Sequence, residues 1–89
     1  MKPIGIAIIG FGKIAADQHV PAIAANERFK LLATSSRSCA GPAPCFADWR
    51  DLLRDVEGLE AVAITTPPGP RMVIAAECAR LGLHVLLEK

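Results

Sequence analysis

The sequence has few aromatic residues and almost no net charge. Its 89 residues include no tyrosine, one tryptophan and three phenylalanines, and the formal net charge is +1 without a basic run. Proteins that bind nucleic acid usually combine a basic surface with aromatic side chains on which bases stack. We therefore expect no nucleic-acid partner.

The sequence also lacks a long uninterrupted apolar segment. Gly5 and Gly10 interrupt the apolar N-terminal stretch, and Lys13 and Asp17 follow it. A membrane-spanning helix needs about 20 consecutive apolar residues, which no run here approaches, and the glycines break the continuous apolar part that a secretory signal has. We therefore expect a cytoplasmic protein with no membrane partner.

The sequence has three cysteines, which is a small and odd number. Cys39, Cys45 and Cys78 form neither a C-x-x-C pair nor a zinc-ligand set. An odd number of cysteines without these spacings predicts free thiols in a reducing compartment.

The N-terminal stretch carries a glycine motif at the end of a predicted strand, Ile4–Ile9. Gly10, Gly12 and Ala15 occupy the small positions of the G-x-G-x-x-G/A fingerprint. The first glycine allows a sharp turn, the second allows close approach of a pyrophosphate, and the alanine lets the next helix pack on the strand. An ordinary strand-to-helix turn is the alternative, but the position after the first strand favours a dinucleotide site.

The remaining pattern predicts alternating strands and helices in one domain. With 52% hydrophobic residues, the chain can form a packed core. The expected elements are a helix Lys13–Asn26 interrupted near Pro21, a strand Phe29–Ser35, a loop Ser38–Pro44, a strand Cys45–Phe46, a helix Trp49–Val56 capped by Asp48, a strand Leu59–Thr65, a stiff loop Thr66–Pro70, a helix Arg71–Leu81 with Gly82 at its end, and a strand Leu83–Leu87. Right-handed crossovers then predict an α/β fold, a Rossmann-type doubly wound parallel sheet of about five strands in the order 3-2-1-4-5.

The end of the second strand indicates which dinucleotide is bound. NAD-selective sites usually place Asp or Glu there, whereas this chain has Ser36 and Arg37. Ser36 can hydrogen-bond a 2′-phosphate and Arg37 can cover it with charge-assisted bonds. NADP is therefore favoured, with NAD possible; the alternative is that Arg37 is a solvated loop charge.

The predicted ligand-facing edge collects the candidate site residues, because the carboxyl ends of parallel strands lie together. The candidate cofactor-binding residues are Gly10, Phe11, Gly12, Lys13, Ile14, Ser36, Arg37, Thr66, Pro67, Pro68, Glu88 and Lys89.

Three segments together resemble one family. They are Gly10–Ala15 with Asp17–Ala22, Thr66–Pro68, and Gly82–Lys89. The chain resembles the N-terminal dinucleotide-binding domain of the Gfo/Idh/MocA oxidoreductases. With Ser36, Arg37 and Arg71 added, it is most similar to the bacterial members that oxidise galactose or arabinose at C1. The resemblance implies that Lys89 has the catalytic role of the lysine in the family's Glu-Lys-Pro motif, which contacts cofactor and substrate.

The resemblance also implies that the 89 residues are an incomplete domain. Family members continue through a sixth strand and a C-terminal substrate domain that supplies further catalytic groups. We therefore expect residues 1–89 to be the cofactor-binding part of an NAD(P)-dependent sugar dehydrogenase that produces a lactone, and to be inactive alone. The alternative is a non-catalytic dinucleotide-binding module, or a self-associating domain fragment. Because Val85–Leu87 forms an apolar edge strand, we expect a homo-oligomer.

Overall fold

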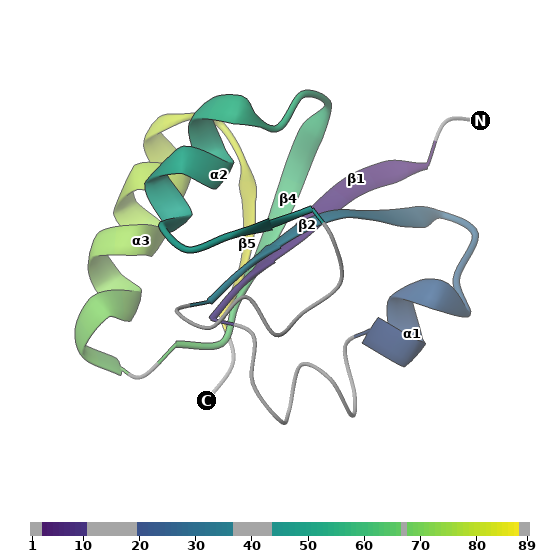
Figure 1. The fold of residues 1–89 in the computed structure, drawn as a ribbon, viewed down its shortest axis with the longest axis horizontal. Coiled ribbons are helices and arrows are strands. Elements are labelled where there is room, and N and C mark those ends of the chain that lie inside the picture. The colour runs from purple at the N-terminus through teal and green to yellow at the C-terminus, as the bar shows by residue number, and fades with distance from the viewer. Residues whose placement is uncertain (1–2, 11–19, 37–43, 67, 88–89) are drawn as a thin grey trace.

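The chain folds into alternating strands and helices, as the computed structural model of residues 3–10, 20–36, 44–66 and 68–87 describes them (Figure 1). The elements are β1 (Ile4–Ile9), α1 (Val20–Ala24), β2 (Phe29–Ser35), β3 (Cys45–Phe46), α2 (Trp49–Asp55), β4 (Leu59–Ile64), α3 (Pro68–Arg80) and β5 (His84–Leu87). All paired strands are parallel, and their order is β3-β2-β1-β4-β5. This confirms the predicted Rossmann-type α/β sheet.

The helices cover both faces of the sheet, with α2 and α3 on one face and α1 on the other (Figure 1). Ile8 and Ala63 pack against Val20 and Ile23 on the α1 face. Because side chains alternate along a strand, Ile9 points to the other face, where it joins a cluster of buried side chains from β4 and α3. The central strands β1 and β4 are thus apolar on both faces, as a buried parallel sheet requires.

Two helix ends follow the sequence signals: the start of α2 and the end of α3. The Asp48 side chain accepts a hydrogen bond from the N–H of Arg50 and caps α2. At the end of α3, Gly82 has φ +79, its N–H donates to the Ala79 carbonyl at 3.0 Å, and the Leu83 N–H donates to the Cys78 carbonyl at 3.0 Å. These two bonds make a Schellman motif, which a glycine at this position favours.

The start of α3 differs from the prediction. The sequence pattern predicts a stiff loop through Pro70 with a helix from Arg71, but α3 begins at Pro68. The first residues of a helix have no intrahelical acceptor for their N–H groups, so proline is tolerated there. The segment Pro68–Pro70 is therefore the first turn of the helix and not part of a loop.

The prediction for α1 is confirmed only in part. The predicted helix runs to Asn26, whereas α1 ends at Ala24. Asn26 instead forms a turn, because its side-chain oxygen accepts a hydrogen bond from the Arg28 N–H at 3.0 Å. The part of that prediction between Lys13 and His19 lies outside the described residues.

The cysteines do not all match the prediction of free thiols. Cys45 is disulfide-bonded, so the prediction is wrong for that residue. Cys78 is free and buried in α3, and burial raises the pKa of its thiol. A protonated, enclosed thiol has little reactivity, so Cys78 acts as a core side chain.

The strand β5 lies at one side of the described sheet. It pairs with β4, and Leu86 and Leu87 are half exposed. Self-association through this strand stays a prediction. Within the described ranges, no helix has the length and apolar character needed to cross a membrane.

Candidate dinucleotide-binding site

The carboxyl ends of four strands lie together at one edge of the sheet. Ile9 is paired with Ser35 on one side and with Ile64 on the other. Beyond these pairs, the Gly10 N–H donates to the Ser35 carbonyl at 2.7 Å, and the Ser36 N–H donates to the Phe46 carbonyl at 3.1 Å. These bonds extend the sheet past the last strand residues and fix where Gly10 and Ser36 lie.

Gly10 occupies a position that only glycine fits. Its φ is +90, a conformation that L side chains rarely adopt. A Cβ at Gly10 would also lie 2.5 Å from the Thr66 Cγ2 atom and 2.9 Å from the Thr66 nitrogen. The sharp turn predicted for the first glycine of the fingerprint is therefore present, and the end of β4 packs directly against it.

Three buried polar atoms around this edge have no hydrogen-bond partner. In the part of the chain that the structure describes, these are the Ser36 hydroxyl, the Thr66 hydroxyl and the Arg71 Nε. A buried donor or acceptor without a partner costs about 1 to 3 kcal/mol. Their grouping at the carboxyl edge leaves three polar atoms available to a ligand.

Two further residues hold the edge together, and the sequence pattern alone assigns neither a role in the site. The Thr65 hydroxyl donates to the Gly10 carbonyl across the two strands. The Arg71 Nη2 atom donates to the Thr66 carbonyl at 3.0 Å. Arg71 is singled out in the sequence only through the family resemblance, and the contact of Thr65 depends on the register of β1 and β4, which the local sequence does not show.

The structure brings together three of the predicted site residues, Gly10, Ser36 and Thr66. Pro68 is the first residue of α3 and follows the same edge. The other predicted site residues lie outside the described residues; they are Phe11, Gly12, Lys13, Ile14, Arg37, Pro67, Glu88 and Lys89.

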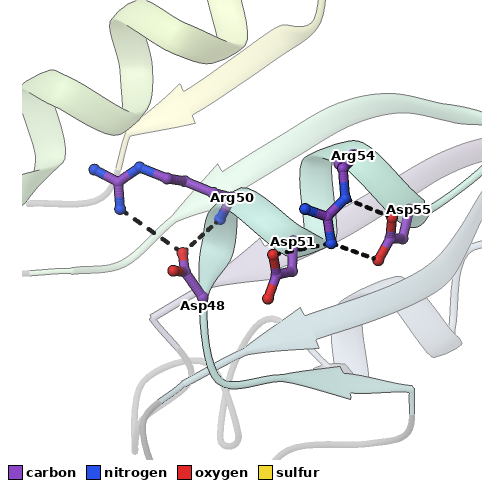
Figure 2. A network of polar contacts seen from close by, with 5 residues as sticks. All are labelled: Asp48, Arg50, Asp51, Arg54 and Asp55. Atoms are coloured by element: carbon purple, nitrogen blue, oxygen red, sulfur yellow. Dashed lines mark hydrogen bonds and ion pairs between the residues drawn. The ribbon is translucent and has the colours of Figure 1, made fainter.

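A concave surface with a volume of about 870 Å³ lies between α2 and α3. Trp49 and Leu53 form part of its apolar lining, and arginines border it. Figure 2 shows that the charges of α2 pair locally: the Arg54 Nη2 atom lies 3.1 Å from Asp51, and its Nε donates to Asp55 at 2.9 Å. The Arg54 guanidinium lowers the pKa of the Asp55 carboxyl. The charges of these exposed ion pairs already have partners within α2. We therefore do not place the dinucleotide site at this concave surface.

The described edge fits a dinucleotide. The turn at Gly10 leaves no room for a side chain, the fingerprint continues from it in the sequence, and two unpartnered hydroxyl groups and the unpartnered Nε of Arg71 belong to the same edge. Hydroxyl and guanidinium groups suit the ribose and phosphate oxygens of such a molecule. In the described residues, no group of three or more His, Cys, Asp or Glu side chains could hold a metal ion. The fold and the edge define a dinucleotide-binding α/β domain.

Comparison with known proteins identifies the family of this domain. Residues 4–89 match the Gfo/Idh/MocA description, an oxidoreductase family with an NAD-binding Rossmann fold. The chain belongs to this family.

The similar proteins include sugar-related oxidoreductases. The chain is 42% identical over 91 residues to a galactose 1-dehydrogenase of Pseudomonas fluorescens, covering 100% of this chain and 30% of that protein. A crystal structure of a D-galactose-1-dehydrogenase protein from Rhizobium etli matches with a TM-score of 0.89 and 40% identity, over 100% of this chain and 29% of that one. A 3-ketoreductase from Actinomadura kijaniata, solved with TDP-benzene and NADP, matches with a TM-score of 0.84 and 27% identity. The match covers 98% of this chain and 30% of that one. The chain thus spans about a third of the length of these relatives.

Proposed function

We propose that the chain binds a nicotinamide dinucleotide at the carboxyl edge of its sheet. The observation that carries this proposal is the group of three unpartnered buried polar atoms, from Ser36, Thr66 and Arg71, around the Gly10 turn. A bound dinucleotide would supply oxygen atoms that these groups can hydrogen-bond. The family match supports the same ligand class.

We further propose that NADP is the preferred cofactor, with NAD also accepted. Ser36 lies at the end of β2 with its hydroxyl buried and unpartnered. Arg37 follows it in the sequence and would pair its charge with the 2′-phosphate. The Actinomadura relative, which was solved with NADP, supports this preference.

The protein to which this domain belongs would act as a sugar dehydrogenase. The galactose 1-dehydrogenases similar to this chain support a reaction at C1 of an aldose such as galactose or arabinose. A hydride would leave C1 for the nicotinamide, the C1 hydroxyl would lose a proton, and the product would be a lactone. Lys89 would help to position the sugar and polarise that hydroxyl.

The 89 residues alone would bind cofactor without turnover. Hydride transfer needs a positioned base and an enclosed substrate pocket as well as cofactor. The relatives extend well beyond the region that matches this chain. Turnover of galactose or arabinose with NADP by the purified 89 residues would contradict this proposal.

Replacement of Arg37 by alanine tests the cofactor preference. We expect Arg37→Ala to weaken NADP by about 1.5 to 3 kcal/mol, because a charge-assisted bond to the 2′-phosphate is lost, and to leave NAD nearly unchanged. Calorimetric titration of both variants with both cofactors measures this. Equal losses for the two cofactors would show that Arg37 does not contact the 2′-phosphate.

A non-catalytic dinucleotide-binding module is the second candidate. It shares the unpartnered atoms and the Gly10 turn, so cofactor titration cannot separate it from the enzyme. A dehydrogenase assay of the longest natural product of the gene, with galactose and arabinose, separates them. NADP binding without reduction of NADP by either sugar would favour the module.

A further inference from the structure

The hydroxyl of Thr65 forms a contact between β4 and the fingerprint turn. Thr65 directly follows β4, and its N–H donates to the Ile9 carbonyl at 2.9 Å, as the parallel ladder requires. Its side-chain hydroxyl donates to the next carbonyl of β1, that of Gly10. The Ile9 carbonyl lies 3.3 Å from the same hydroxyl, but a hydroxyl has one proton, so the shorter contact to Gly10 dominates.

The Gly10 carbonyl is a group that the sheet does not hold by itself. β1 ends at Ile9, and with φ +90 Gly10 turns the chain away from the strand direction. Because the peptide group is planar, a bond to its carbonyl fixes the plane of the whole peptide that leaves Gly10. The Thr65 hydroxyl therefore holds the orientation of the Gly10 carbonyl, the last described carbonyl before the rest of the fingerprint.

Thr65 is itself held in place from both sides. Its N–H is bonded to β1, and the carbonyl of the next residue, Thr66, accepts the bond from Arg71 in α3. The Thr66 backbone also packs against the Gly10 Cα, where no side chain could fit. The backbone at the end of β4 is thus held by hydrogen bonds, and it contacts the turn at the end of β1.

We propose that Thr65 is a positioning residue for the dinucleotide, acting through its hydrogen bond to the Gly10 carbonyl. This inference rests on the proposed function. Thr65 does not need to touch the cofactor, because it orients the peptide group of the turn that approaches the phosphates. The pyrophosphate is common to NAD and NADP, so Thr65 acts on both cofactors alike, in contrast to Arg37.

Two pairs of variants isolate the hydroxyl. Thr65→Val keeps nearly the same shape and removes the hydroxyl, whereas Thr65→Ser keeps the hydroxyl and removes a methyl group. We expect Thr65→Val to raise the dissociation constants of NADP and NAD by the same factor, about fivefold, and Thr65→Ser to stay within about twofold of the wild type. Calorimetric titration of the 89-residue chain measures both. If Thr65→Val does not fold by circular dichroism, Thr65→Ala is compared with Thr65→Ser, since these two differ only in the hydroxyl oxygen.

A core variant controls for loss of stability. Ile74→Val removes one methylene from the apolar core and no polar group, and it should lower the unfolding temperature without changing either dissociation constant. Wild-type affinity in Thr65→Val, equal weakening by Thr65→Ser, or equal weakening by Ile74→Val would each overturn the inference. Failure of the wild type to bind either cofactor would overturn the proposed function instead.

Discussion

The two ends of β1 each carry a glycine that close packing requires, yet they differ in what surrounds it. At the amino end, a Cβ on Gly5 would lie 2.4 Å from the Gly58 carbonyl oxygen and 2.5 Å from the Leu32 Cδ1 atom. The pairing of β1 with β4 shifts register there, and the Gly5 N–H is bonded to the Glu60 carboxylate at 3.2 Å. Protein atoms thus block a side chain at Gly5 and partner its N–H, although Gly5 also borders a hollow of about 510 Å³.

At the carboxyl end, the glycine is just as constrained but its surroundings are incomplete. Gly10 is close to Thr66, and the unpartnered atoms of the described residues, in Ser36, Thr66 and Arg71, belong to this edge. A glycine forced by packing is therefore not by itself evidence for a ligand. The difference lies in the unpartnered polar atoms, which are available to a polar ligand.

Replacement of Gly10 should have the largest effect. We expect Gly10→Ala to destabilise the fold by about 3 kcal/mol, because positive φ and contact with the Thr66 backbone both oppose a side chain. The displaced turn should also raise the NADP dissociation constant by about 100-fold. Urea denaturation and calorimetric titration measure the two effects.

The control for Gly10→Ala is Gly82→Ala. Gly82 has a similar φ of +79, but a Cβ at Gly82 would have nothing within 4 Å, so this change tests the backbone conformation alone. It should cost about 1 kcal/mol and leave NADP affinity unchanged. Equal effects of the two substitutions would show that the contact with Thr66 is unimportant.

Replacement of Gly5 should separate stability from binding. Gly5→Ala forces a methyl group against the Gly58 backbone and should cost about 2 kcal/mol of unfolding free energy. Because Gly5 lies at the end of β1 opposite the proposed cofactor edge, the NADP affinity of the folded variant should equal that of the wild type. Weaker binding, measured well below the unfolding temperature, would mean that the two ends of β1 are coupled.

The sequence predicts much of this fold because its signals are local. The strands Phe29–Ser35 and Cys45–Phe46 are observed at their predicted bounds, and Asp48 caps α2 as expected. The start of α3 is not predicted, since Pro67–Pro70 is compatible with a loop or with a first helical turn. Whether the segment forms a loop or a helical turn depends on the folded connection between β4 and α3.

The site is predictable only in part, for a similar reason. Gly10, Ser36 and Thr66 follow predicted strands, and parallel strands bring their carboxyl ends to one edge. The bond from Thr65 to Gly10 joins residues 55 positions apart, and the disulfide of Cys45 likewise depends on the folded chain. Such contacts follow from register and packing, which no local pattern encodes.

Replacement of Thr66 should give the smallest change and the sharpest test of the comparison. Thr66→Val removes a buried hydroxyl that has no partner in the free protein and keeps a similar shape. The free protein should therefore be more stable by about 1 kcal/mol, because burial of the Thr66 hydroxyl costs free energy that no hydrogen bond compensates. NADP should bind about fivefold more weakly, because the hydroxyl that would pair with the cofactor is gone.

At the amino edge, Glu60→Ala should do the opposite: it removes the partner of the Gly5 N–H, so stability should fall and affinity should not change. Urea denaturation and calorimetric titration of both variants give four values, and a Thr66→Val protein that is less stable yet binds NADP normally would show that the hydroxyl serves the fold and not the ligand.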